Sequence, residues 1–143
     1  MGNQRKSPEK LLQKSIIQWI NIRYPTIEVW LAPSTGTFSF QKGTYLKQSK
    51  YVKKGVSDIL GIFPNGTWLS IEVKVKPNKP TVEQLDFLKM IGDRGGVAMW
   101  IYSIEDVEEY LKQALQISPH LLQSPGQFSP LENIPTLLRE EMS

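Results

Sequence analysis

The chain has 143 residues, of which 40% are hydrophobic and 22% charged, and this composition fits one folded domain and excludes a disordered or collagen-like chain. It holds no cysteine and one histidine, which excludes disulfides, thiolate zinc sites and multi-histidine metal sites, so any metal must be bound by oxygen atoms. The net charge of +3 and the pI near 9.1 favour a polyanionic partner only mildly, because many unrelated proteins are equally basic.

The first predicted elements are a helix, a strand and a basic segment. Pro8 suits a first helical turn, and apolar residues then recur at helical spacing up to Tyr24, which predicts a helix over residues 7–23. Residues 26–32 are β-branched and aromatic and lie between two prolines, which predicts a strand. Residues 34–55 are polar and rich in glycine, lysine and aromatic side chains, which is typical of a hairpin or a long loop.

Residues 56–76 predict an antiparallel hairpin, because two apolar arms flank the turn sequence Pro64-Asn65-Gly66. In the second arm, apolar residues at 69, 71, 73 and 75 alternate with Trp, Ser, Glu, Lys and Lys at 68, 70, 72, 74 and 76, so one face belongs to the core and the other is polar. A two-residue turn would place Asp58 opposite Val73, on the wrong face. A three-residue loop with left-handed Gly66, or a bulge near Gly61, would place Asp58 opposite Glu72, and we expect one of these two.

The remaining elements are a helix, a strand, a second helix and a tail. Thr81 predicts the start of a helix that ends at residues 92–96, residues 97–102 predict a buried strand, and Ser103 caps a helix through Leu115, with Asp106 at the capping-box position. Residues 118–143 hold four prolines and predict a loosely packed tail with room for a short helix near 136–141. The expected fold is α/β, with a mixed central sheet flanked by helices in α-β-β-β-α-β-α order over residues 1–117.

Asp58, Glu72 and Lys74 form the main candidate site, because the hairpin can bring two carboxylates and one ammonium together beside the backbone carbonyl of Val73. Oxygen ligands of this kind suit Mg²⁺, which keeps several bound waters. A metal-bound water could attack phosphorus, while Lys74 positions or deprotonates that water or stabilises the developing negative charge. The alternative is structural: Asp58 is a turn residue, and the other two lie on a solvated strand face. The spacing of the three residues alone does not separate these interpretations.

Four segments in order resemble the PD-(D/E)XK nucleases, and most of all their virus-type replication-repair group, VRR-NUC. They are GVSDILG at 55–61, IEVK at 71–74, TVEQLDFL at 81–88 and GGVA at 95–98, and the likeness spans about residues 9–115. Ser57 departs from the pattern, because proline often precedes the aspartate. The resemblance implies a restriction-endonuclease-like core and hydrolysis of DNA phosphodiesters with Mg²⁺ or Mn²⁺ as cofactor.

The resemblance also implies roles for individual residues. Asp58 and Glu72 would be metal ligands and Lys74 catalytic. Gln84 would lie near the site, although it could equally form a capping box with Thr81. Glu9 would face the metal, directly or through water, although a carboxylate is also favourable in a first helical turn.

The basic segment that leads into Asp58 is the candidate DNA-binding surface. Its lysines can neutralise phosphates and its tyrosines can stack on exposed bases; they are Lys42, Tyr45, Lys47, Lys50, Tyr51, Lys53 and Lys54. The alternative is a hairpin that only aids solubility, and its direct connection to Asp58 favours DNA contact. Such contacts position the backbone and give no sequence readout by themselves.

Three functions follow as candidates. The leading one is a metal-dependent DNA endonuclease that could act on flaps or four-way junctions. A sequence-specific homing or restriction-type endonuclease would use the same three residues, and a DNA-binding accessory module would keep the fold without catalysis. The resemblance further implies a homodimer. We expect no membrane partner and a cytoplasmic location, because no apolar run approaches the roughly 20 residues that span a bilayer and residues 1–6 lack the apolar stretch of a secretory signal.

Overall fold

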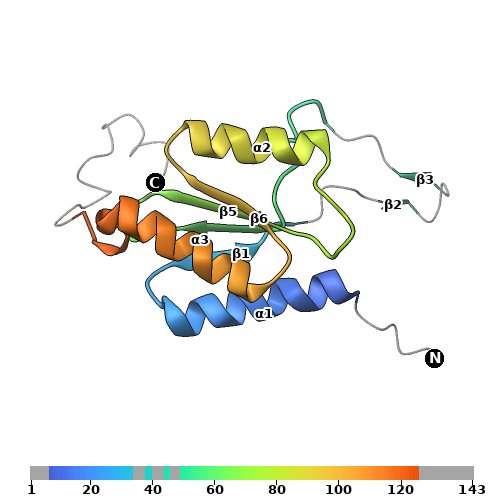
Figure 1. Cartoon of the computed structure of the whole chain (residues 1–143). Coiled ribbons are helices and arrows are strands. Elements are labelled where there is room, and N and C mark those ends of the chain that lie inside the picture. The colour runs from blue at the N-terminus through green and yellow to red at the C-terminus, as the bar shows by residue number, and fades with distance from the viewer. Residues whose placement is uncertain (1–6, 34–37, 40–43, 46–48, 126–143) are drawn as a thin grey trace, which may run out of the picture.

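The computed structural model describes residues 7–33, 38–39, 44–45 and 49–125, which build a central sheet with helices on both faces (Figure 1). The main elements are α1 (Pro8–Arg23), β1 (Glu28–Leu31), β4 (Ile59–Ile62), β5 (Trp68–Val73), α2 (Val82–Asp93), β6 (Val97–Ile101) and α3 (Ile104–Ile117). A separate two-stranded hairpin consists of β2 (Phe38–Ser39) and β3 (Thr44–Tyr45), and a 3₁₀ helix, η1 (Pro119–Leu122), follows α3. The α/β class and the predicted order of elements are confirmed.

The central sheet is mixed, as predicted. Its strand order is β1-β4-β5-β6, with β1–β4 and β4–β5 antiparallel and β5–β6 parallel. The parallel pair needs a crossover connection, which α2 supplies. The predicted first strand is shorter than expected, because the backbone N–H of Ile27 donates to the Tyr24 carbonyl in a turn before Glu28.

The helices begin where the sequence predicts. The Ser7 hydroxyl accepts a hydrogen bond from the Lys10 N–H at the start of α1, and the Ser103 hydroxyl accepts one from the Asp106 N–H at the start of α3. Asp106 does not complete a capping box, because its carboxylate accepts from Tyr102 N–H and not from Ser103. Among the helices of the described ranges, none is both long enough and apolar enough to cross a bilayer.

The turn between β4 and β5 is the three-residue loop. The Gly66 N–H donates to the Phe63 carbonyl, the Phe63 N–H donates to the Thr67 carbonyl, and Gly66 has a left-handed φ of 91°. The ladder then runs without a bulge through the pairs Ile62–Trp68, Gly61–Leu69, Leu60–Ser70 and Ile59–Ile71. One further step along this register places Asp58 opposite Glu72, as the candidate site requires.

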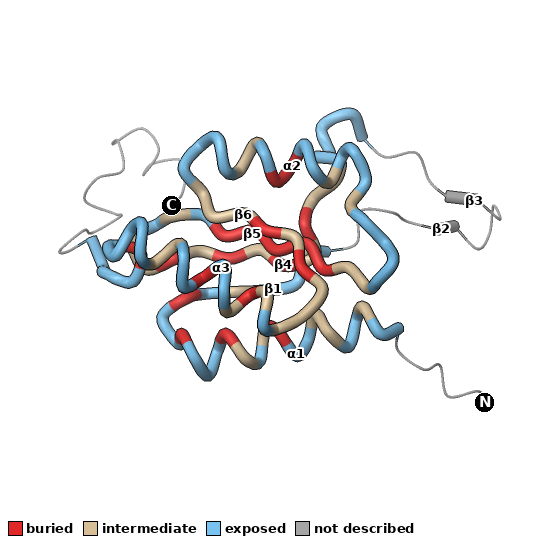
Figure 2. Tube along the Cα trace, in the orientation of Figure 1, coloured by how far each residue is buried: buried red, intermediate tan, exposed pale blue. Residues whose placement is uncertain are grey.

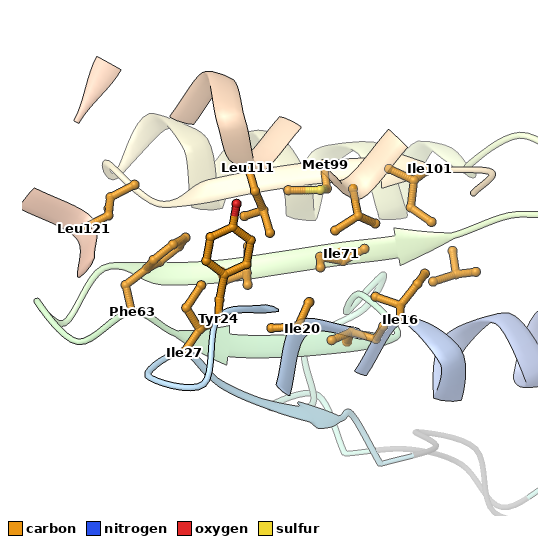
Figure 3. Packing of buried hydrophobic residues seen from close by; sticks show 14 residues of the cluster. Ile16, Ile20, Tyr24, Ile27, Phe63, Ile71, Met99, Ile101, Leu111 and Leu121 are labelled. Atoms are coloured by element: carbon orange, nitrogen blue, oxygen red, sulfur yellow. The ribbon is translucent and has the colours of Figure 1, made fainter. Parts of the chain in front are cut away.

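The core lies between the sheet and the helices α1 and α3. Leu69, Ile71 and Val73 of β5 are fully buried and pack with side chains from both helices, among them Ile16, Ile20, Val107 and Leu111 (Figure 3). Because strand side chains alternate, Ser70 and Glu72 point to the opposite face, towards the layer that holds α2. β5 is buried along most of its length (Figure 2), so the structural alternative, in which Glu72 lies on a solvated strand face, is wrong for this residue.

Ordered packing continues beyond residue 117. Leu121 in η1 is buried and belongs to the same core cluster, so the expectation of a loosely packed tail is wrong for this first part. The apolar side chain draws η1 against the core because burial of a leucine is worth about 2 kcal/mol. The predicted short helix near 136–141 lies outside the described residues.

Gly55→Ala is expected to lower the free energy of unfolding by about 3 kcal/mol, because two costs add at this position. Gly55 has a φ of 72°, and an added Cβ would lie 2.2 Å from the Glu83 carbonyl oxygen, which is backbone and cannot rotate away. Gly66→Ala is the matched control, since its φ of 91° carries the conformational cost but no atom lies within 4 Å of the added Cβ. Urea unfolding followed by circular dichroism should give a clearly smaller loss for the control, and equal losses would contradict the close approach.

Candidate active site

The hairpin brings Asp58, Glu72 and Lys74 to the same end of β5. Asp58 directly precedes β4, Glu72 lies near the end of β5, and Lys74 follows that strand. The Val73 N–H donates a hydrogen bond of 2.9 Å to Asp58 Oδ2, and the Lys74 N–H donates one of 2.9 Å to the Ile101 carbonyl of β6. Backbone groups of β5 and β6 therefore fix the position of the Asp58 carboxylate and of the Lys74 backbone.

Glu72 is the least ordinary residue of the site. Its side chain is 1% exposed, and within the described ranges neither carboxylate oxygen has a hydrogen-bond partner. The nearest cation is the Lys74 ammonium, 3.4 Å from Oε1, which makes an ion pair without a hydrogen bond. Unpaired carboxylates are rarely buried because removing their hydration costs several kcal/mol. The arrangement is therefore expensive for folding and indicates a group kept for function.

The pKa of Glu72 is raised from its ordinary value to about 8, and burial is the largest cause. The negative charge of Asp58 also raises this pKa, whereas the positive charge of Lys74 lowers it without cancelling the other two effects. If both carboxyl groups were ionised beside the Lys74 ammonium, the three groups together would carry one net negative charge. A divalent cation would let both carboxylates ionise together.

The residues present fit a hard divalent cation. The N–H and C=O of one strand residue point to the same neighbour, so the hydrogen bond from Val73 N–H to Asp58 implies that the Val73 carbonyl points to the Asp58 side of β5. No group of three or more Asp, Glu, His and Cys side chains gathers in the residues that the structure describes. Two carboxylates and one carbonyl suit Mg²⁺ or Mn²⁺, which retain bound water, better than ions that need a complete protein cage.

A cleft of about 640 Å³ borders Asp58, and neither Glu72 nor Lys74 is among the side chains that line it. It is bordered by the first turns of α1, the end of β1, residues 56–58 and the chain that follows β5, so its lining includes Glu9, Lys10, Asp58 and Asn78. Glu9 thus lies on the same cleft as Asp58, but it does not complete a three-acid cluster with the two carboxylates. Its contact with a cation through water stays a prediction.

Gln84 forms the capping box of α2. Its Oε1 accepts from the Thr81 N–H at 2.9 Å, and its own N–H donates to Thr81 Oγ1 at 3.2 Å. The alternative interpretation of Gln84, a capping box with Thr81, is therefore confirmed. A catalytic role for Gln84 stays a prediction, which now has to be compatible with the cap.

Part of the basic segment lies within the described residues. Lys50, Tyr51, Lys53 and Lys54 are all exposed, Tyr51 at 85%, and the Lys50 ammonium lies 5.1 Å from the centre of the Tyr51 ring. Lys53 and Lys54 border a small pocket together with Glu83 and Asp86 of α2, so acidic neighbours oppose part of their charge. Lys42 and Lys47 lie outside the described residues, and Tyr45 is placed only as backbone in β3. The predicted DNA contact is open for all seven.

Sequence reasoning missed two features of the site. One is Lys10, which lines the cleft beside Glu9; the resemblance implied that Glu9 of this helix faces the site, but no local pattern connects Lys10 to Asp58. The other is a buried hydrogen bond between Ser57 and Ser70. Ser70 in the middle of the apolar strand β5 was the signal in the sequence that could have indicated this bond, since buried hydroxyls need hydrogen-bond partners.

Comparison with known proteins identifies the fold. No protein-family model and no curated protein matches the chain. A solved structure described as a "VRR_NUC domain protein" is similar to it, with a TM-score of 0.52 and 19% sequence identity over 77% of this chain and 89% of that chain. At this identity the likeness concerns the fold alone. The chain therefore has the fold of this VRR_NUC domain protein.

Proposed function

We propose that this protein is a divalent-metal-dependent endonuclease that hydrolyses DNA phosphodiester bonds. The observation that carries the proposal is the buried Glu72 carboxylate, whose oxygens have no hydrogen-bond partner in the described residues and which lies between Asp58 and Lys74. Such a group is destabilising unless it binds something positive. The likeness in fold to a VRR_NUC domain protein supports the proposal of a nuclease.

Asp58, Glu72 and the Val73 carbonyl would hold Mg²⁺ or Mn²⁺, which when bound supplies an acidified water and shields phosphate charge. The chain's own groups do the remaining work. The Val73 N–H fixes the Asp58 carboxylate by the 2.9 Å hydrogen bond, and the sheet keeps Glu72 out of bulk water. The Lys74 ammonium, 12% exposed, is placed to donate a hydrogen bond to a phosphate oxygen and to stabilise its growing negative charge.

DNA is the proposed substrate because the cleft beside Asp58 has cationic neighbours. Lys10 lies on the cleft itself, and the exposed Lys50, Lys53 and Lys54 belong to the segment that enters the site. Charge of this kind attracts the phosphate backbone without reading sequence. Selectivity for flaps or four-way junctions, and the homodimer implied by the resemblance, are further parts of the proposal that solution measurements have to test.

The test is incubation of the purified protein with labelled linear, flapped and four-way DNAs, each with Mg²⁺, Mn²⁺, Ca²⁺ or EDTA. We expect cleavage with Mg²⁺ or Mn²⁺ and none with EDTA, with nicks placed by the DNA structure. A discrete set of bands on linear duplex would instead support the sequence-specific endonuclease. DNA binding without cleavage, across all metals and substrates, would contradict the proposal and support the accessory module.

A further inference from the structure

A buried pair of hydroxyl groups lies next to the candidate site. Ser57 and Ser70 are both completely buried, and Ser70 Oγ donates a hydrogen bond of 2.7 Å to Ser57 Oγ. Ser57 immediately precedes Asp58, and Ser70 precedes Glu72 by two residues on the same face of β5. One hydrogen bond therefore connects the chain segments that carry the two carboxylates.

The sheet register shows that this bond is not part of ordinary strand pairing. In the ladder, Ser70 is paired with Leu60, which lies three residues after Ser57. Ser57 is therefore outside the ladder, and its side chain lies over the face of β5 where it contacts Ser70. Asp58 is the residue at which the chain enters the sheet, because its carbonyl accepts a hydrogen bond from the Ala32 N–H of the segment after β1. Before Asp58, residues 55–57 pass close to α2, since Gly55 lies against the backbone of Glu83. The serine pair thus holds residues 55–57 against the strand that carries Glu72.

Asp58 needs such a restraint because its side chain is partly exposed and can turn towards water, whereas Glu72 is enclosed by the sheet. The Val73 N–H is one restraint on the Asp58 side chain, and the serine pair restrains the backbone just before it. A hydroxyl pair is suited to this position, since it is neutral and adds nothing to the local negative charge.

We propose that Ser57 and Ser70 are positioning residues that hold the Asp58 carboxylate within reach of Glu72, so that both can bind one divalent cation. The inference rests on the proposed function of the site, because positioning of the two carboxylates matters only if they share a cation. Partners of metal ligands act in this way by fixing ligand orientation, and their loss lowers metal affinity about 10- to 100-fold.

The experiment is calorimetric titration of Mn²⁺ into the full-length protein and into Ser57→Ala, Ser70→Ala and the double variant, at 10 °C with folding checked by circular dichroism. Each single variant should bind Mn²⁺ about tenfold more weakly. The double variant should bind no more weakly than the weaker single one, because all three remove the same hydrogen bond. Steady-state cleavage should need more Mn²⁺, with the KM for DNA unchanged.

Two controls separate positioning from general stability. Val107→Ala removes buried volume from α3, on the other face of the sheet, and should reduce stability without changing Mn²⁺ affinity. Ser70→Thr keeps the hydroxyl, and should keep Mn²⁺ affinity within about threefold of wild type even if its extra methyl lowers stability.

The outcomes distinguish this inference from the function on which it rests. Serine variants that bind Mn²⁺ as tightly as wild type, or that lose affinity only as much as Val107→Ala, would overturn the positioning role while leaving the nuclease proposal intact. Additive losses in the double variant would also overturn it, since they would mean that the hydroxyls act separately. A wild-type protein that binds neither Mn²⁺ nor Mg²⁺ would overturn both proposals.

Discussion

Asp58→Ala is expected to reduce metal-dependent DNA cleavage by about 10³-fold or more, with DNA affinity within about threefold of wild type. The substitution removes one of the two carboxylates proposed to share a cation, and it leaves the Val73 N–H without its acceptor. DNA affinity should persist because the exposed lysines that are proposed to attract phosphate are separate from Asp58. The measurement is single-turnover cleavage with saturating protein, together with DNA binding in Ca²⁺.

Lys74→Ala should also stop cleavage, but with a different signature. The ammonium is 3.4 Å from Glu72 and supplies no ligand, so calorimetry should still detect Mn²⁺ binding while the cleavage rate falls by about 10²- to 10³-fold. Metal binding should move to higher pH, because Lys74 is the charge that favours ionisation of Glu72. Lys89→Ala is the matched control, since Lys89 is exposed on α2 and pairs only with Asp93 in the described structure. Wild-type cleavage rates in both site variants would contradict the proposed chemistry.

The site could be predicted to the extent that local geometry decides it. A three-residue turn fixes the register between β4 and β5, and with a side-chain period of two the register decides whether Asp58 faces Glu72 or the core. Residues 64–66 alone left this register open between a two-residue turn and a three-residue loop. The requirement that Asp58 face Glu72 favoured the three-residue loop or a bulge near Gly61, and the structure has the loop. The capping box of Thr81 and Gln84 is local in the same way.

Features that depend on contacts between residues far apart in the chain could not be predicted from the sequence. The alternation in β5 predicts a polar face but not whether anything covers it, and the burial of Glu72 results from the crossover through α2 and from the segment that ends at Asp58. The contribution of α1 to the cleft and the return of Leu121 to the core are long-range in the same sense. The degree of burial is what raises the pKa of Glu72, so its electrostatics could not be predicted either.

Glu72→Gln is expected to stabilise the metal-free protein in alkaline solution while eliminating cleavage. The pKa of Glu72 is raised to about 8 in the folded protein from an ordinary value of 4.5. Between these values the folded chain keeps a proton that the unfolded chain has released. Stability from the neutral carboxyl is therefore complete below pH 4.5 and is lost as pH rises through 8, by up to about 1.4 kcal/mol per pH unit.

Glutamine is neutral throughout, so the variant should not show this loss. Its free energy of unfolding should match that of wild type near pH 5 and exceed it by several kcal/mol near pH 8.5, in urea titrations with EDTA present. Glu105→Gln, at an exposed position of α3, controls for the general effect of removing a carboxylate and should change little. Parallel pH profiles for wild type and Glu72→Gln would contradict the buried, ionisable carboxyl.

Metal should then narrow this difference in stability. At a free Mn²⁺ concentration of 100 times its Kd, binding adds about 2.7 kcal/mol to the unfolding free energy of the wild type, because the ion binds only the folded site. The glutamine variant has lost the negative charge that a hard cation requires and should gain nothing. The wild type would then be less stable than its inactive variant without metal, and it would regain stability when it binds metal. This result would mean that Glu72 is retained for chemistry although it lowers folding stability.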